Sequence, residues 1–369
     1  MNFAVEILQE IDENLWNNNL SQNKASTAYQ IANWTKTYEE SFGSQPLYIL
    51  VKNNNGKIVG QLTALIHTKF IWRNANVLSR FIGYGLNLGS LLTWFYGPII
   101  HDQPHREEII SKILIAIDNV AAKNKINMIR GISPPLERPF DDTIFKNIGY
   151  TIRPWSTYVI SLGLDTDKIY VSLDKKIRYE IRKAEESGVK FEVVNDRSLL
   201  DEYVKLRIQE NYRIKEKARL RPNVLDNNWK FLNEKGYAKV FLASHKGQVI
   251  GGIWNIIFNG NIVQHGVVNS SKTKLGGSFL TWNTIKWTRE NGYCTYDMGG
   301  ANPYPKSEKE KGIDFYKSKW GGTRMDYTIY VKVFNKTKAR LSSAIVSPRR
   351  AISKMSRITR PNSKSTNRF

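Results

Sequence analysis

The sequence contains little that would suit an oxidising compartment or a metal centre. Its one cysteine, Cys294, cannot form an internal disulfide, so we expect a reducing, cytoplasmic location. The five histidines lack acids or a second cysteine at ligand spacing, and no metal site is predicted. No basic segment followed by an apolar run stands at the N-terminus, which argues against a secretory signal.

Long apolar runs are also scarce. Residues 81–100 form a twenty-residue stretch without a charge, which is about the length that spans a bilayer. Four glycines and Pro98 interrupt this stretch, and its apolar residues come in short bursts. Such punctuation favours two buried strands and a turn over a transmembrane helix.

Acidic residues are few relative to basic ones, and the formal net charge is +22. Residues 336–369 contain ten Lys or Arg and no acid, so the rest of the chain carries +12. This surplus favours polyanionic partners, namely tRNA, a phosphorylated or lipid-linked precursor, or anionic lipid. The basic tail mixes apolar and cationic residues, so we expect a peripheral membrane contact through 336–369. A merely solvated, flexible tail is the alternative.

The chain is long enough for two ordinary domains, and an internal repeat supports that division. Residues 46–67 and 238–259 each contain an apolar strand, a polar turn ending in glycine, and a second strand. Gly56 and Gly247 lie 191 residues apart, as do Gly60 and Gly251. Both segments are predicted to be β-hairpins.

The elements after each hairpin also correspond. A strand, a helix and another strand are expected at 94–100, 107–123 and 126–132, and again at 261–268, 278–290 and 293–298. A duplicated α/β unit is therefore predicted. Charged helices are expected at 174–187 and 199–219, and a final strand at 325–333. We place the domains at 1–155 and 156–322, with the active cleft in the second. Residues 323–335 are expected to return to the first domain.

The loop at residues 270–278 (SSKTKLGGS) is a candidate anion site. Free N–H groups and the positive end of a helix dipole attract phosphate, and glycine permits close approach. Gly276, Gly277 and Ser278 are therefore the candidate cofactor-binding residues. Their spacing departs from that of acetyl-CoA-dependent transferases, and a helix start capped by serine is the favoured alternative.

A second candidate site combines an acid, two glycines and a lysine. Asp297 precedes Gly299-Gly300 at the end of a predicted strand, where sites form in α/β folds. In the next segment, 312–322 (GIDFYKSKWGG), Lys317 stands among aromatic residues and could stabilise an oxyanion. Asp297 could act as a base, or simply hold the loop. The aromatic residues could equally be core and Lys317 a surface lysine.

Four local patterns resemble the Fem-type (FemAB/FemX-like) aminoacyltransferases. They are residues 29–43 (YQIANWTKTYEESFG), 177–189 (IRYEIRKAEESGV), 296–300 (YDMGG) and 316–322 (YKSKWGG). The last is similar to the family's Phe-Lys-x-x-Phe-Gly-Gly turn, with Tyr and Trp in place of the phenylalanines. The similarity covers roughly residues 25–335. Without a long helical hairpin insert, the chain is similar to the compact members.

The resemblance implies an α/β fold of two tandem acetyltransferase-like (GNAT-like) domains with mixed sheets. It implies an acyltransferase that moves an aminoacyl group from aminoacyl-tRNA to an amine of a cell-envelope, peptidoglycan-type precursor, with no tightly bound cofactor. Lys317 would act on the acyl-transfer intermediate, and Tyr316 would pack near the terminal adenosine of the tRNA. The further substrate-binding candidates are Trp34, Lys36, Arg178, Arg182 and Tyr212.

Several alternatives stay open. Arg178 and Arg182 share a helix face at i,i+4 spacing and could simply pair with neighbouring glutamates in solvent. The enzymatic rival is an acetyl-CoA-dependent N-acetyltransferase that acts on an amino sugar. A rival of another class is a non-catalytic module that binds tRNA or a membrane.

Overall fold

The structure is a computed structural model that describes residues 2–68, 88–213 and 222–346. The first half contains β1 (Ala4–Leu8), α1 (Glu13–Ser21), η1 (Ala28–Gln30), α2 (Ala32–Phe42), β2 (Gln45–Lys52), β3 (Ile58–His67), β4 (Leu91–Trp94), β5 (Ile99–Ile100), α4 (Arg106–Lys123), β6 (Met128–Ile132) and α5 (Asp142–Asn147). Then come β7 (Thr151–Ser161), α6 (Thr166–Ser172), α7 (Lys175–Glu186), β8 (Lys190–Val194), α8 (Arg197–Arg213), α9 (Pro222–Asn228), η3 (Trp229–Asn233), β9 (Ala238–His245), β10 (Gln248–Phe258), β11 (Asn261–Asn269), α10 (Gly276–Glu290), β12 (Thr295–Ala301), α11 (Glu308–Ser318), β13 (Thr323–Val333) and α12 (Lys336–Val346).

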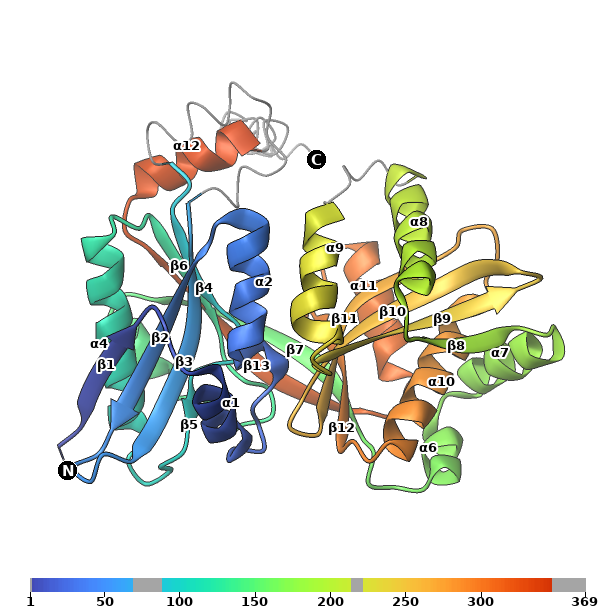
Figure 1. Ribbon diagram of the computed structural model, residues 1–369, viewed down its shortest axis with the longest axis horizontal. Helices are drawn as coiled ribbons and strands as arrows, with labels where there is room; N and C mark the ends of the chain where they lie inside the picture. Colours follow the sequence, from blue (N-terminus) through green and yellow to red (C-terminus); the bar gives the residue numbers. More distant parts are fainter. Residues whose placement is uncertain (1, 69–87, 214–221, 347–369) are drawn as a thin grey trace, which may run out of the picture.

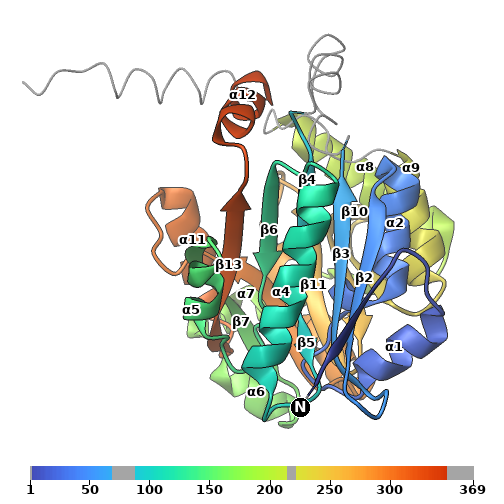
Figure 2. The same ribbon diagram turned by 90° about the vertical axis from the view of Figure 1, so that its left-hand side faces the viewer.

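All described strands belong to one mixed sheet that runs through both halves of the molecule (Figure 1). The order along it is β1-β2-β3-β4-β6-β13-β7-β12-β11-β10-β9-β8, with β5 beside β3. Helix α4 covers the outer face of the first half, as Figure 2 shows from that side. Its buried face consists of Ile109, Ile110, Ile113, Leu114 and Ile117, at the spacing of an amphipathic helix.

The predicted duplication is confirmed by strand pairing. In the first half, β2 and β3 form an antiparallel hairpin, β3 pairs antiparallel with β4, and β4 pairs parallel with β6. In the second half, β9, β10, β11 and β12 repeat this order and these directions. Helices α4 and α10 make the parallel crossover in each half, as a parallel strand pair requires.

The two halves exchange a strand. After α5, β7 pairs with β12 of the second half through residues 156–161. After α11, β13 returns to pair with β6 of the first half through residues 329–333. Strands β7 and β13 also pair with one another, through residues 151–159 and 323–331. The expected return of the last strand is thus present. Our domain boundaries at 155 and 322 stay predictions, because β7 spans the first of them.

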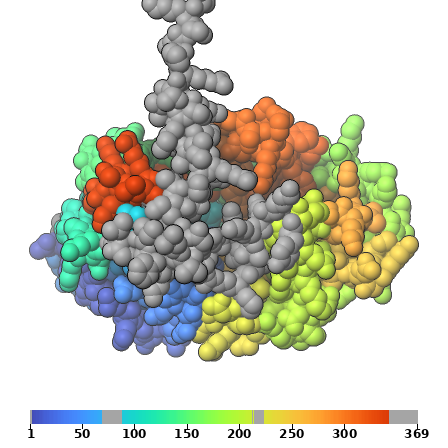
Figure 3. Space-filling model, turned by 90° about the horizontal axis from the view of Figure 1, so that it is seen from above, coloured from blue at the N-terminus to red at the C-terminus, as the bar shows by residue number. Residues whose placement is uncertain are grey.

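A shared core joins the halves. Trp16 of α1 and Trp34 of α2 belong to the same buried cluster as Leu225 of α9 and Trp254 of β10. Hydrogen bonds cross the same junction, including Asn17 to Tyr237 at 3.3 Å. From above, the blue and green first half and the yellow and orange second half lie side by side (Figure 3). Because the buried apolar side chains of this cluster come from both halves, each half stabilises the other.

Three expectations about elements need correction. The strand predicted at 94–100 is broken: β4 ends at Trp94 and β5 begins at Ile99, because Pro98 has no N–H for a ladder and Gly97 donates its own to Ile132. The segment around Lys317 is a helix, α11, rather than a turn. The basic tail is not wholly flexible, since Lys336–Val346 forms α12.

Some expectations lie outside the described residues, namely those for residues 81–87, for 214–219 and for the tail beyond 346. Within the ranges that the structure describes, no helix is long and apolar enough to cross a membrane.

Candidate functional site

Helix α11 carries Lys317 towards the end of β12. A capping box fixes its start: Ser307 Oγ accepts from the Glu310 N–H at 3.2 Å, and the Glu310 carboxylate accepts from the Ser307 N–H at 3.0 Å. This S-x-x-E signal is present in the sequence and could have revealed the helix. Lys317 lies in the last turn of α11, which faces Gly299 and Gly300 of β12, where the pairing with β7 is irregular.

The Lys317 ammonium binds the backbone of these two glycines. Its Nζ donates to the carbonyl oxygens of Gly299 at 2.6 Å and Gly300 at 3.0 Å. Gly299 has a φ of 78°, in the left-handed region that favours glycine, and a Cβ there would lie 3.6 Å from Nζ. An ammonium has three donors, and the backbone takes two. The third can bind a substrate oxygen.

Burial makes this ammonium weakly basic. Removal from solvent lowers the pKa of Lys317 to about 8, and the negative charge of Asp297 opposes that shift. At pH 7 the protonated form therefore still dominates by roughly ten to one. A fixed cation in a half-buried place stabilises developing negative charge better than one in bulk water.

Asp297 is buried, and both oxygens of its carboxylate accept hydrogen bonds. Its carboxylate accepts from the Gly299 N–H at 2.7 Å, from the Tyr96 hydroxyl at 3.2 Å and from the Thr157 hydroxyl. Burial raises the pKa of Asp297, and these hydrogen bonds oppose the rise. The geometry fits the alternative in which Asp297 holds the adjacent backbone, at Gly299. A direct role as base stays a hypothesis.

Tyr96 connects Asp297 to a cluster of aromatic rings from both halves. Its ring lies 5.1 Å from that of Tyr29 and 5.6 Å from that of Tyr327. The Tyr29 hydroxyl contacts His265 Nδ1 at 3.3 Å. His265 is the extra residue of a bulge in β11, because Trp254 pairs with Gly266 and Asn255 pairs with Gln264. Bulges commonly re-aim a side chain in this way.

Tyr316 lines a cavity of about 510 Å³. This cavity brings together three residues that the sequence singled out, Gly277, Ser278 and Tyr316. The remaining lining residues are Tyr179, Glu180, Lys183, Asn269, Ser270, Thr273, Lys274 and Leu275. The start of α10 and residues of α7 therefore both line this cavity.

A carboxylate occupies the start of α10. Ser278 Oγ donates to Glu180 at 2.6 Å, and Leu275 is the N-cap without a side-chain hydrogen bond. The predicted serine cap is thus wrong, and the helix begins at Gly276. A Cβ on Gly276 would lie 3.1 Å from the Ile250 carbonyl, which explains this glycine by close packing.

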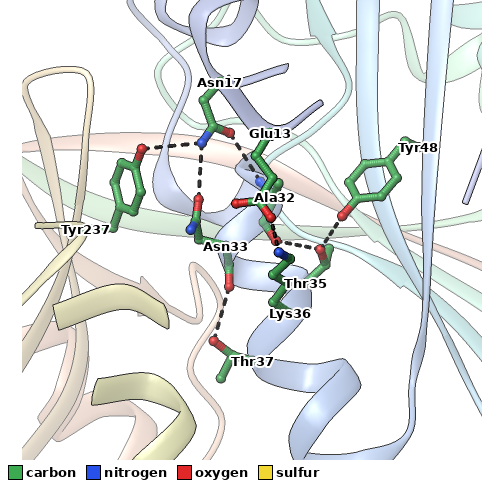
Figure 4. Close-up of polar contacts among 9 residues, drawn as sticks. All are labelled: Glu13, Asn17, Ala32, Asn33, Thr35, Lys36, Thr37, Tyr48 and Tyr237. Carbon is green, nitrogen blue, oxygen red and sulfur yellow. Dashed lines mark hydrogen bonds and ion pairs between the residues drawn. The ribbon is translucent and has the colours of Figure 1, made fainter. Parts of the chain in front are cut away.

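The other predicted residues lie elsewhere. Lys36 pairs with Glu13 of α1 (Figure 4). Trp34 is 2% exposed, and its ring packs 5.2 Å from that of His265, so it fits a core residue better than a substrate contact. Arg182 is exposed and Arg178 half-buried on α7. The α7 residues that line the cavity are instead Tyr179, Glu180 and Lys183. Tyr212 lies on α8, and its side chain is outside the described residues.

The sequence could not reveal the partners of Asp297. Thr157 is 140 residues away and approaches through the pairing of β7 with β12. Tyr96 is 201 residues away and comes from the first half. No local pattern marks either residue.

Comparison with known proteins agrees with this architecture. Residues 172–318 match the family model of the Acetyltransferase (GNAT) domain. The crystal structure of FemX is similar with a TM-score of 0.69 and 15% identity, over 91% of this chain and 99% of that one. No curated protein matches the chain.

Two further structures share the fold. One is the C-terminal domain of a proposed lysylphosphatidylglycerol synthetase from Agrobacterium fabrum, with a TM-score of 0.55, 12% identity and coverage of 90% and 96%. The other is a tandem GNAT protein from the clavulanic acid biosynthesis pathway, with a TM-score of 0.55, 10% identity and coverage of 89% and 98%. The chain therefore has a FemX-like fold of tandem acetyltransferase-type units, and residues 172–318 in its second half match an acetyltransferase domain.

Proposed function

We propose that this protein is an aminoacyltransferase that moves an aminoacyl group from aminoacyl-tRNA to an amine of a cell-envelope, peptidoglycan-type precursor. The observation that carries the proposal is the half-buried Lys317 ammonium, held on Gly299 and Gly300 with one donor left over. A cytoplasmic site of action, with peripheral contact at an anionic membrane, is part of the proposal.

The chemistry needs positioning more than a nucleophilic side chain. The acceptor amine attacks the carbonyl carbon of the aminoacyl ester, and the tetrahedral intermediate carries an oxyanion that Lys317 would stabilise. The C–O ester bond then breaks, an amide remains, and the ribose hydroxyl leaves with a proton. The attacking nitrogen loses its own proton to solvent or a neighbouring base. Holding the two reactants in one site supplies much of the rate.

The choice of donor rests on Glu180. An acetyl-CoA-dependent enzyme would place a diphosphate at the start of a helix such as α10. Here the Glu180 carboxylate accepts from Ser278 at that place, and it would repel a diphosphate. A tRNA donor needs no diphosphate there, and the net charge of +22 suits a polyanionic partner.

The similar structures favour the same class of reaction. The lysylphosphatidylglycerol synthetase bears the name of an enzyme that joins an aminoacyl group to a lipid. Its fold covers 90% of this chain. The likeness supports aminoacyl transfer as a class and leaves the acceptor to experiment.

A second candidate function is an acetyl-CoA-dependent N-acetyltransferase acting on an amino sugar. The match of residues 172–318 to the Acetyltransferase (GNAT) domain favours it. A titration with acetyl-CoA and with a charged tRNA mixture separates the two. Binding of charged tRNA alone supports aminoacyl transfer, whereas micromolar binding of acetyl-CoA alone would replace it with the second candidate.

A further inference from the structure

Two arginines project from the same face of the central strands. Arg130 of β6 pairs with Val331 of β13, and Arg153 of β7 pairs with Ile329 of the same strand. Cross-strand partners and residues two apart share a face of a sheet, so both arginines lie on one face. Neither side chain makes a hydrogen bond or an ion pair with any residue in the described parts of the chain.

Both arginines are exposed, and each lies beside residues with a defined arrangement. Arg130 lines a small cavity of about 100 Å³ together with Tyr38, His67 and Phe95. Arg153 lies over the Trp155 ring, 4.9 Å from its centroid. Partial removal from solvent lowers the pKa of Arg130, and the like charge of Arg153 lowers it further. Two neighbouring cations repel one another, and an anionic ligand would relieve that repulsion.

This pair is connected to the acyl-transfer site by direct contacts. Trp155 and Tyr327 are cross-strand partners on the same face as the arginines. A Cβ on Gly300 would lie 2.5 Å from Trp155 Nε1 and 2.9 Å from the Tyr327 hydroxyl, so both side chains touch this glycine. The Gly300 carbonyl in turn accepts from Lys317. A row of contacts therefore leads from Lys317 to Arg153.

We propose that Arg130 and Arg153 bind an oxyanion of the acceptor, a carboxylate or a phosphate, while the acceptor amine reaches the Lys317 end of the row. The guanidinium fork suits both oxyanions. This inference rests on the proposed function, since it assigns the acceptor of the same reaction. It places the anion at residues other than Lys36, Arg178 and Arg182.

The test is equilibrium binding of matched probes to the full chain, without any donor. Lysyl-alanine is compared with its C-terminal amide, and glucosamine 6-phosphate with glucosamine, by calorimetry at low and at high salt. The variants are Arg130→Gln, Arg153→Gln and the double variant. Arg324→Gln is the matched control, because Arg324 lies on β13 and pairs with Asp326. Circular dichroism melts show whether each variant is folded.

An anionic probe is expected to bind at least about tenfold more tightly than its neutral twin at low salt. The double variant should lose that preference, and Arg324→Gln should keep it. The probe that shows the preference identifies the oxyanion as carboxylate or phosphate. Equal binding of the twins by the wild type, or a preference that survives in the folded double variant, would overturn the inference. Because no donor is present, failure of aminoacyl transfer would not affect this result.

Discussion

Lys317 Nζ lies 2.6 Å from the Gly299 carbonyl oxygen. The two residues belong to neighbouring elements, α11 and β12, which are joined by a loop. The contact ties the last turn of α11 to Gly299 of β12, whose N–H donates to Asp297. The carbonyl and the N–H of Gly299 are thus both held by side chains. The lysine is consequently oriented before any substrate arrives, as electrostatic catalysis requires.

The rate of transfer should decline above the pKa of Lys317. The pKa of Lys317 is lowered to about 8, so the ammonium loses its proton as the pH rises through that value. A reaction that needs the cation then slows about tenfold per pH unit. Lys317→Arg, whose guanidinium stays charged, should lack this decline even if its rate is lower. Single-turnover rates across the pH range on both sides of this pKa check this. A wild-type rate that rises through this range in step with Lys317→Arg would contradict it.

Removing the carboxylate at the start of α10 should admit a diphosphate. Glu180→Gln leaves the side chain in place but removes its negative charge, so CoA should bind the variant about tenfold more tightly than the wild type. Calorimetric titration with CoA measures the difference. Glu186→Gln, on the exposed side of the same helix, is the control and should match the wild type. Tight binding of CoA by the wild type itself would show that Glu180 does not prevent CoA from binding.

Asp297→Asn should weaken both the fold and the reaction. Asparagine turns one acceptor into a donor. The Thr157 hydroxyl and the Gly299 N–H share Oδ1, whereas the Tyr96 hydroxyl binds Oδ2, so an amide that keeps the first two bonds leaves the Tyr96 hydroxyl without its acceptor. An unsatisfied buried group costs about 1–3 kcal/mol of unfolding free energy, measured by urea denaturation. Thr157→Val should lower stability in the same direction, whereas Thr157→Ser should retain it. If Asp297→Asn abolished transfer with unchanged stability, a chemical role for the carboxylate would be favoured.

Deletion of residues 336–369 should weaken binding to anionic surfaces without unfolding the protein. The deletion removes ten positive charges, and it begins after β13 ends at Val333. Cosedimentation with phosphatidylglycerol vesicles, and filter binding of tRNA, should both decrease, and the melting temperature should stay the same. Truncated protein that binds with the same affinity and salt dependence would show that the tail is merely solvated.

The duplicated architecture could be predicted from the sequence because its signals are local. The glycine spacing of the two hairpins, at Gly56 and Gly247, marks turns that depend on neighbouring residues alone. The same holds for α4, whose apolar face is continuous. The segment around Lys317 resembles a turn because glycines surround it, although Ser307 and Glu310 give a capping signal for a helix.

The composition of the site could not be predicted, since it depends on long-range pairing. Asp297 meets Thr157 only because β7 crosses into the second half, and it meets Tyr96 only because the halves share a core. The role of Glu180 is likewise invisible in the sequence. Its nearness to Arg178 and Arg182 in the sequence suggests a solvent ion pair, whereas its carboxylate accepts from Ser278.

The most direct test of the proposed function is single-turnover transfer of a radiolabelled amino acid from a charged tRNA mixture to lysyl-alanine, by wild-type protein and by Lys317→Met. Lys311→Met is the control, because Lys311 lies on the same helix and pairs with Glu308 in solvent. We expect transfer by the wild type and the control. In Lys317→Met we expect a loss of at least about a hundredfold, with tRNA binding unchanged. Equal rates in all three proteins would contradict the role of Lys317 on which the proposed function depends.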